Sequence, residues 1–458
     1  MRCSVVIPCH NGSELTRACV ESLLLQSAFR PREILLVDNA STDDTRGLSA
    51  MHDTVRVIEQ PANLGFAGGV NAGLRAATQP FVLVLNNDTL AAANLLRELH
   101  AALTSDERIG AAAPVSNHVK GEALLAIGQG GRSADQRAAV AAQLQHEAAP
   151  IQDVGTLAGL CLLVRRATLD EIGPFDERFG HGNFEDDDFC LRLRLAGYRL
   201  VIARRAFLHH EGHATFRALG LDLGEQIAKR RLQYEAKWRT DAAGRAAIAA
   251  LRGELAAAAV AAAAALRAWP KWPDADWHLA RWHRSRGEPA AALPCLIAFL
   301  RSCPAHAEAA IELGCTLLAL GRTHDAHRQF ATALRTCHVT AAQQAKMLLR
   351  LGEHAYRAGR PGEAADDFRL AVQLAPEQGC LHNWLGLCLL ADGDHRAAAA
   401  AFEKAAALGF ALAHSNLGIC WHHLGQKAAA TASFARACEL LPDDATARAN
   451  LALVTAGG

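Results

Sequence analysis

The run Val5-Val6-Ile7-Pro8-Cys9-His10-Asn11 begins with three β-branched residues and continues with polar ones. Such a run predicts a buried β-strand that ends at the polar residues. Three further apolar runs repeat this arrangement, and helical patterns separate them. The expected strands are 4–8, 33–38, 55–59 and 81–86, and the expected helices are 14–26, 68–77 and 91–103. Alternating strands and helices predict a mainly parallel α/β sheet over residues 1 to about 220.

A different pattern begins near residue 272, where a leucine followed by a small residue recurs. The leucines are Leu279, Leu313, Leu351, Leu385 and Leu417, so the steps are 34, 38, 34 and 32 residues. Each leucine is followed by glycine after eight residues and alanine after thirteen. A large apolar residue stands seventeen residues after each leucine, at Leu296, Phe330, Phe368, Phe402 and Phe434. This stretch resembles five tetratricopeptide repeats of ~34 residues each.

Composition and charge exclude several classes of protein. The 458 residues carry 47 Lys plus Arg and 47 Asp plus Glu, so the net charge is zero. A dedicated nucleic-acid-binding protein, which needs a basic field, is therefore not expected. The 13 cysteines are an odd number and form no CxxC pair, which indicates free thiols in a reducing compartment. No run reaches the ~18 apolar residues of a membrane span. We expect a cytoplasmic protein, either free or peripheral to the inner membrane.

Four short motifs follow one another over residues 5–89. After the first run comes Leu36-Val37-Asp38-Asn39-Ala40-Ser41-Thr42-Asp43. The third is Asn63-Leu64-Gly65-Phe66-Ala67-Gly68-Gly69-Val70-Asn71-Ala72-Gly73, and the fourth is Leu85-Asn86-Asn87-Asp88-Thr89. In this order they resemble glycosyltransferase family 2, the inverting nucleotide-sugar transferases with the GT-A fold. The resemblance extends to about residue 240.

The resemblance divides the chain into three expected parts. Residues 1–240 would form a GT-A domain with a Rossmann-like mixed sheet. Residues 241–271 are rich in alanine and would form a rigid helical connector, or alternatively an imperfect first repeat. Residues 272–458 would form an all-α solenoid of about five tetratricopeptide repeats with a terminal capping helix.

Polar residues at the ends of the expected strands form the candidate donor site. Asp38 ends a buried strand, where a carboxylate is poorly placed for stability but can accept hydrogen bonds from a nucleobase or ribose. A helix N-cap, the alternative role, suits Asp43 better. No GxGxxG follows the first strand, which disfavours a hydride-transfer enzyme. The residues expected to bind the nucleotide sugar are Pro8, Asn11, Asp38, Asn39, Asn63, Gly65, Asn71 and Asn87.

The resemblance also implies a metal site. Asp88 occupies the last position of the family's DxD motif, whose carboxylate binds a divalent metal bridging the donor diphosphate. Asn86 and Asn87 replace the first two members, so one carboxylate would hold Mn²⁺ or Mg²⁺ together with phosphate oxygens and water. A histidine after the strand at 200–202 completes the metal site in the family, and His210 fits best, with His209 as the alternative.

The run Glu185-Asp186-Asp187-Asp188 begins with Glu185-Asp186, which resembles the family's ED motif. A helix dipole would explain one or two carboxylates there, but four adjacent ones repel, which raises the pKa of one of them. We expect Asp186 to be the general base and Glu185 and Asp188 to be orienting residues. Asp186 would take a proton from the acceptor as it attacks the anomeric carbon opposite the leaving nucleotide. Lys229, Arg230 and Arg231 either neutralise the diphosphate or form a solvated basic face.

These features predict an inverting, metal-dependent hexosyl- or deoxyhexosyltransferase that uses a UDP- or dTDP-sugar. The acceptor would be a protein or peptide bound in the repeat groove. One alternative is a transferase for lipid-linked or surface polysaccharide, whose repeats dock onto an assembly or pair two copies of the chain as a homodimer. A second alternative is a non-catalytic nucleotide-binding scaffold. Residues 117–154 are expected to read the sugar hydroxyls.

Overall fold

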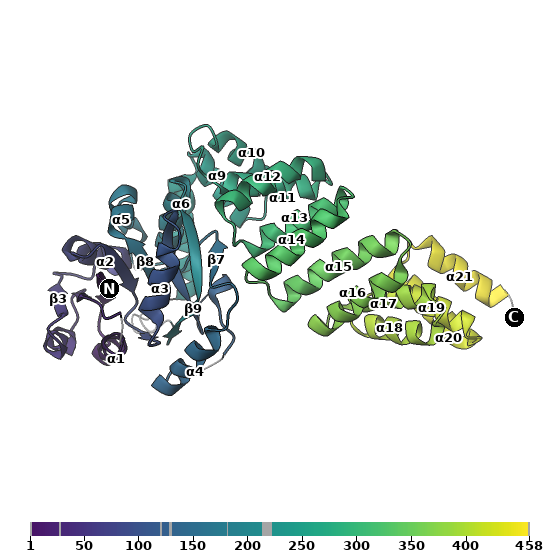
Figure 1. Cartoon of the computed structure of the whole chain (residues 1–458), viewed down its shortest axis with the longest axis horizontal. Helices are drawn as coiled ribbons and strands as arrows, with labels where there is room; N and C mark the ends of the chain where they lie inside the picture. Colours follow the sequence, from purple (N-terminus) through teal and green to yellow (C-terminus); the bar gives the residue numbers. More distant parts are fainter. Residues whose placement is uncertain are drawn as a thin grey trace. The chain divides into compact units, whose positions relative to one another are not determined.

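The computed structural model describes residues 2–26, 29–119, 121–127, 131–180, 182–212 and 222–456 (Figure 1). The chain forms two compact units. The first consists of Met1–Ala310 with Thr332–His338, and the second of Ile311–Ala331 with Val339–Gly458. The expected boundaries after residues 240 and 271 both fall inside the first unit, so the three-part division remains a prediction about the sequence. Within the described ranges, no helix is long and apolar enough to cross a membrane.

One mixed sheet of nine strands organises the described part of the first unit, in the order β3-β2-β1-β4-β8-β6-β9-β5 with β7 also on β9. Pairs among β1, β2, β3 and β4 are parallel, whereas β8 runs antiparallel to both β4 and β6. The predicted mixed sheet is therefore confirmed. The strands are β1 (Cys3–Cys9), β2 (Glu33–Asp38), β3 (Val55–Glu59), β4 (Phe81–Leu85), β5 (Thr89–Ala91), β6 (Ile109–Ser116), β7 (Ile151–Val154), β8 (Cys161–Arg165) and β9 (Arg199–His210).

The early helices lie close to their predicted positions, as α1 (Ser13–Leu24), α2 (Gly65–Ala76) and α3 (Leu95–Thr104). Helix α2 begins three residues earlier than expected, where the Asn63 Oδ1 accepts a hydrogen bond from the Gly65 N–H at 2.9 Å. The predicted helix 91–103 begins later because Thr89–Ala91 forms β5, which pairs antiparallel with β9. That strand depends on a partner more than 100 residues away, so local periodicity does not reveal it.

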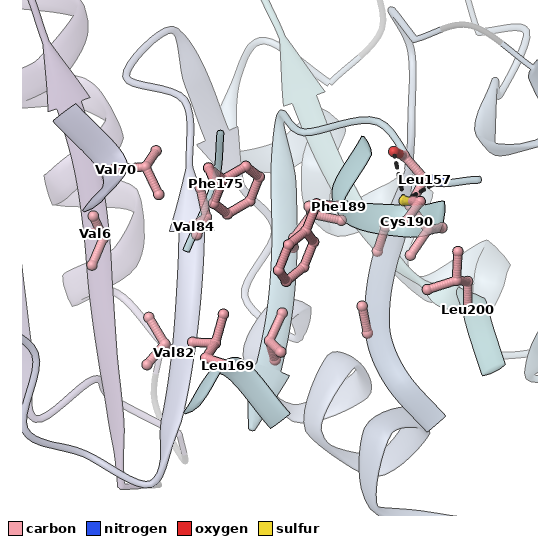
Figure 2. Close-up of a cluster of buried hydrophobic side chains, with 14 of the residues drawn as sticks. Val6, Val70, Val82, Val84, Leu157, Leu169, Phe175, Phe189, Cys190 and Leu200 are labelled. Atoms are coloured by element: carbon pink, nitrogen blue, oxygen red, sulfur yellow. Dashed lines mark hydrogen bonds between the residues drawn. The ribbon is translucent and has the colours of Figure 1, made fainter. Parts of the chain in front are cut away.

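Both faces of the sheet are buried. Alternate residues of β1 and β4 enter opposite hydrophobic clusters, because successive side chains of a strand point to opposite faces. Val6, Val82 and Val84 belong to one cluster, which Figure 2 shows beside Phe175 and Phe189. The other cluster contains Val5, Ile7, Leu83 and Leu85 with side chains of α1 and α3. The near-continuous apolar runs in the sequence therefore correspond to strands covered on both sides.

Glycines bring α2 against the parallel strands. A Cβ at Gly69 would lie 2.7 Å from the Asn39 Nδ2 and 3.0 Å from the Pro8 Cβ. A Cβ at Gly73 would overlap Val6. The glycines that the sequence displays in this region thus permit close helix–strand packing, and α2 starts beside the carboxyl ends of β1 and β2.

Helices and short 3₁₀ turns complete the first unit. The segments 242–251 and 255–265, expected as a connector, form two helices that pack on each other, and the second also packs on α11. They share a core with Tyr234, Trp272 and Phe179. The elements are η1 (Asp44–Met51), η2 (Gly121–Ala123), α4 (Ala134–Leu144), α5 (Arg166–Ile172), η3 (Glu177–Phe179), α6 (Glu185–Leu195), α8 (Leu223–Trp238), α9 (Ala242–Leu251), α10 (Leu255–Ala265), α11 (Asp274–Ser285) and α12 (Pro289–Ser302).

The rest of the chain is a series of helix pairs, as predicted for an all-α array. Within the second unit, the repeated glycine is explained by the repeated phenylalanine. A Cβ at Gly352 would lie 2.7 Å from the Phe368 ring, and Gly386 and Gly418 stand in the same relation to Phe402 and Phe434. The helices are α13 (Ala307–Ala319), α14 (Thr323–Thr336), α15 (Ala341–Arg357), α16 (Pro361–Leu374), α17 (Gly379–Ala391), α18 (His395–Ala407), α19 (Ala413–His423), α20 (Lys427–Leu440) and α21 (Ala445–Ala456).

Candidate functional site

A cavity of about 870 Å³ opens in the first unit at the carboxyl ends of β1, β2 and β4. Parallel strands bring their carboxyl ends to one edge of the sheet, so residues far apart in sequence meet there. The opposite wall consists of residues 121–124, residues 154–160 and the start of α6. Eight of the predicted site residues line the cavity: Pro8, Asn39, Asn63, Gly65, Asn87, Glu185, Asp186 and His210.

Asn39 links the strands on the donor side of this cavity. Its N–H donates to the Cys9 carbonyl at 2.8 Å, and its carbonyl bonds the His10 Nδ1 at 2.8 Å. Its side-chain Nδ2 donates to the Gly65 carbonyl at 3.1 Å. The Oδ1 of Asn39 is buried and has no hydrogen-bond partner among the described residues. A buried acceptor without a partner is costly, and an N–H or O–H of a ligand would satisfy it.

The remaining four predicted residues do not line the cavity. Asn11 accepts a hydrogen bond from the Thr42 N–H at 2.8 Å. Asp38 is fully buried and accepts from the Ser41 N–H at 2.8 Å and from the Arg46 Nε at 3.3 Å. These contacts hold the turn that carries Asn39.

Asn71 bonds both the N–H and the carbonyl of Phe175, at 3.0 and 2.8 Å. This contact ties α2 to the segment that precedes η3. Asp88 lies just outside the lining, against His210.

Asp88 and His210 form a pair at the metal position. The His210 Nε2 lies 3.3 Å from the Asp88 Oδ1, and its Nδ1 bonds the His118 carbonyl at 2.8 Å. Burial lowers the pKa of His210, but the Asp88 hydrogen bond and charge outweigh it, so the pKa stands above its usual value. His209 instead lies 3.5 Å from Glu211 and does not line the cavity.

This donor set fits a divalent ion only in part. A carboxylate and an imidazole whose other nitrogen is held by a carbonyl are suitable ligands. Among the residues that the structure describes, no group of three or more His, Cys, Asp or Glu is arranged to hold a metal. An ion bound at Asp88 and His210 would therefore complete its shell with phosphate oxygens and water.

The four carboxylates that begin α6 have different surroundings. Glu185 is buried, and its Oε2 has no hydrogen-bond partner among the described residues. Burial, together with the charges of Asp186 and Asp187, raises the pKa of Glu185 well above the usual range. Asp186 accepts hydrogen bonds from the Gly159 N–H at 2.9 Å and the Asp187 N–H at 3.0 Å. Asp188 is fully buried and bonds the Arg192 Nε at 3.0 Å. Asp186 is thus both oriented and in the lining, whereas Asp188 is engaged elsewhere.

Backbone strain marks the approach to this turn. Asn183 and Phe184, directly before Glu185, have φ of 75° and 69°. Asparagine tolerates this left-handed region, but a bulky residue pays a cost of order 1–3 kcal/mol. Such strain concentrates at functional sites, and the sequence contains no signal for it at a phenylalanine.

Sequence reasoning missed Arg230 as a buried residue. One interpretation of the basic run on α8 was a solvated basic face. Lys229 fits that interpretation because it is exposed. Arg230 is 7% exposed, and a Cβ at Gly180 would lie 2.7 Å from its Nη2. Its positive charge lowers the pKa of Glu185, although burial and the neighbouring carboxylates dominate.

The sequence also did not predict that residues 121–124 and 154–160 form a wall of the cavity. Residues 121–124 and part of 154–160 lie in or beside the segment expected to read sugar hydroxyls. Thr156 donates to the Asp187 Oδ1 at 3.0 Å, and the Leu157 N–H donates to the Cys190 sulfur at 3.3 Å. The Cys190 thiol donates back to the Leu157 carbonyl at 3.6 Å (Figure 2). Gly155 and Gly159 are the local signal for a turn, but only the fold brings that turn to α6.

Comparison with known proteins identifies the families that the two parts of the chain match. The family model for glycosyl transferase family 2 matches residues 4–172, and that for tetratricopeptide repeats matches 311–378 and 385–445. N-acetylglucosaminyl-diphospho-decaprenol L-rhamnosyltransferase of Mycobacterium tuberculosis is 32% identical over 214 residues, covering 41% of this chain and 69% of that protein. The pre-mycofactocin glycosyltransferase of the same species is 28% identical over 220 residues, covering 47% and 43%.

A crystal structure of GalNAc-T7 with UDP, GalNAc and Mn²⁺ is similar with a TM-score of 0.38 and 16% identity, covering 46% of this chain and 44% of that one. The chain belongs to glycosyltransferase family 2 and carries tetratricopeptide repeats after its transferase region. The two Mycobacterium tuberculosis relatives are sugar transferases.

Proposed function

We propose that the protein is an inverting glycosyltransferase that moves a hexosyl or deoxyhexosyl group from a UDP- or dTDP-sugar to a protein or peptide acceptor. The observation that carries the proposal is the grouping of an oriented carboxylate, Asp186, with the Asp88–His210 pair and the unpartnered Asn39 acceptor around one cavity. Donor-binding, metal-binding and proton-accepting groups are the three components that the reaction requires.

Binding of the donor uses the ends of the parallel strands. The Asn39 Oδ1 accepts from the nucleoside, and the N-terminus of α2 at Gly65 presents its positive dipole to the diphosphate. Asn11, Asp38 and Asn71 contribute by holding the turns that shape this side. A divalent ion, Mn²⁺ or Mg²⁺, held by Asp88 and His210 would neutralise charge that develops on the leaving diphosphate.

Proton transfer is assigned to Asp186. The acceptor O–H attacks the anomeric carbon, the bond from that carbon to the diphosphate oxygen breaks, and the acceptor proton passes to the Asp186 carboxylate. Two N–H donors, from Gly159 and Asp187, fix the orientation of this carboxylate. Glu185, whose raised pKa favours the protonated form, reduces the negative charge beside the base and supports its position. Attack from the face opposite the leaving group inverts the anomeric centre.

The repeats support a protein or peptide acceptor, because stacked helix pairs present an extended binding surface. We place this enzyme in the cytoplasm. A second candidate is a transferase for a lipid-linked acceptor that works peripherally at the inner membrane. It is favoured by the relative whose name specifies a diphospho-decaprenol acceptor. In that case the repeats would dock onto an assembly or join two copies of the chain.

The decisive experiment measures nucleoside diphosphate released from a panel of UDP- and dTDP-sugars, with Mn²⁺ or with chelator. Asp186→Asn should abolish release, whereas Asp170→Asn, a matched change at a largely exposed carboxylate on α5, should not. Absence of turnover with every donor would support the non-catalytic scaffold instead, whereas full activity of Asp186→Asn would show that Asp186 is not the base.

The acceptor class is tested separately by removing residues 339–458, which leaves every segment of the first unit in place. Transfer to peptide acceptors should fall while hydrolysis of the donor by water persists. Undiminished peptide transfer would show that the second unit does not recruit the acceptor. Transfer to a polyprenyl-diphosphate sugar in place of peptides would favour the lipid-linked alternative.

A further inference from the structure

The cavity wall formed by residues 121–124 and 154–160 is held from behind by residues of the helical region. Two separate contacts do this, and both lie within the first unit. One joins β7 to the turn between α12 and α13, and the other joins η2 and β9 to His338, just after α14.

Asp153 of β7 is the centre of the first contact. Its carboxylate is about 1% exposed and receives the Arg199 Nε and Nη2, each at 2.8 Å. The Ala305 N–H donates to the same carboxylate at 2.8 Å, and the Asp153 N–H donates back to the Ala305 carbonyl at 3.2 Å. A buried carboxylate that accepts from a fork-shaped guanidinium and a backbone N–H is rigidly placed.

From Asp153 the chain leads directly to the candidate base. Val154 ends β7, and the next residues form the wall of the cavity. Leu157 is bonded to Cys190, and the Gly159 N–H is the donor to the Asp186 Oδ2. The orientation of Asp186 therefore depends on the position of this wall, and the position of the wall depends on Asp153.

The second contact supports the other wall segment. Arg204 of β9 donates to the Glu122 carbonyl at 3.1 Å, and its Nη2 lies 3.0 Å from the His338 Nε2. The His338 Nδ1 lies 3.1 Å from the Glu147 carboxylate. Glu122 lines the cavity, so His338 is joined to the wall through one arginine.

We propose that the first helical repeats are positioning elements of the transferase site, with Asp153 and the turn at 303–305 setting the wall that orients Asp186. The proposal rests on the proposed function for the role of Asp186. It assigns two roles to the helical region, since residues 303–305 and 338 support the site while the second unit is left for recruitment. A cut after residue 271, the boundary expected from the sequence, would remove Ala305, which donates to Asp153.

The test compares two buried carboxylates in the full-length protein. Asp153→Asn weakens the contact behind the wall. Glu33→Gln changes a buried carboxylate at the start of β2, which accepts from the Thr78 N–H at 2.7 Å and the Thr78 Oγ1 at 2.8 Å, and neither residue lines the cavity. Ala305→Pro is the second variant, since it removes the N–H donor and fixes φ at that position while leaving the Asp153 and Arg199 side chains unchanged.

Two readouts separate positioning from general stability. Hydrogen exchange of a peptide covering 154–160 should increase about tenfold or more in Asp153→Asn and Ala305→Pro, while peptides of β1 and β4 stay unchanged. Release of nucleoside diphosphate in the presence of Mn²⁺ should show kcat reduced about tenfold or more, because small misplacements of reacting groups are costly. The Kd for UDP or dTDP should stay within about threefold, a difference well under 1.4 kcal/mol. Glu33→Gln should change neither the exchange of the wall peptide nor kcat.

The proposal is overturned if Ala305→Pro folds with unchanged exchange at 154–160, or if Glu33→Gln has the same effects as Asp153→Asn. Exchange is measured without turnover, so it also decides the matter if no donor is hydrolysed. In that case the proposed function fails, while the mechanical link from residue 305 to the wall is still tested.

Discussion

Gly69→Ala tests how closely the donor side of the cavity depends on one missing methyl group. The new Cβ would lie 2.7 Å from the Asn39 Nδ2 and 3.0 Å from the Pro8 Cβ. Asn39 cannot simply move aside, because its backbone N–H is bonded to Cys9 and its side chain to Gly65. We expect α2 to shift away from the strands, or the Asn39 amide to rotate out of position.

The magnitude follows from three contributions. Overpacking of a tight contact costs about 1–3 kcal/mol, and loss of the Asn39–Gly65 hydrogen bond costs about 0.5–1.5 kcal/mol. Alanine gains about 0.5–1 kcal/mol over glycine within a helix, which opposes them. The free energy of unfolding should therefore fall by about 0.5–4 kcal/mol. Gly362→Ala in α16 is the matched control, since its Cβ would meet nothing within 4 Å and only the helical gain remains.

Urea unfolding followed by pulse hydrogen exchange of β1 and α2 peptides measures the stability of the first unit separately from that of the second. Calorimetric titration with UDP and dTDP gives the effect on the site. Loss of one hydrogen bond from Asn39 to the nucleotide should weaken binding by about 2- to 10-fold. If Gly69→Ala is as stable as the wild type and binds nucleotide equally well, the close approach does not shape the donor site.

Three further changes have defined outcomes. Asp88→Asn should abolish Mn²⁺-dependent release of nucleoside diphosphate, because a single imidazole holds a hard ion poorly; activity equal to that of Asp170→Asn would contradict the metal site. Gly352→Ala should destabilise the second unit by about 1–3 kcal/mol, since its Cβ would lie 2.7 Å from the Phe368 ring. Phe368→Leu in the same chain should recover part of that loss in a double-mutant cycle of urea midpoints, and strict additivity would refute the contact. Burial lowers the pKa of His306 from 6.5 to about 4. The unfolded chain therefore binds a proton at a higher pH than the folded chain does, and the free energy of unfolding should fall by about 1–3 kcal/mol as the pH falls from 6.5 to 4. Urea unfolding of His306→Gln should lack this loss.

Strand and helix positions on the donor side follow from short-range pattern. The expected strands 33–38 and 55–59 coincide with β2 and β3, because an apolar run bounded by polar turns contains the information for a buried strand. The repeats could also be predicted from the sequence, since each glycine–phenylalanine contact lies within one helix pair. Asn39 and Asp186 were found in sequence because motif and spacing place them at element ends.

Other predictions from the same motifs were less specific. Asn71 and Asp38 belong to the motifs, yet their side chains bond backbone groups outside the cavity lining. A motif shows that a polar residue occurs at a strand end or helix start. It does not show whether that residue faces a ligand or supports a neighbouring loop, because this depends on which loop packs beside it.

By itself, the sequence determined the α/β region, the helical repeats and the polar ends of the strands, since all three are encoded by local periodicity and composition, and its motifs supplied the resemblance to a transferase family. Only the tertiary structure decided that His210 rather than His209 meets Asp88, and that residues near 305 and 338 contact the segments that form the cavity wall. The partners in these contacts are separated by many tens of residues, and in most cases by more than 100. Such contacts arise from how twisted strands and packed helices meet in space, and no local pattern in the chain records that geometry.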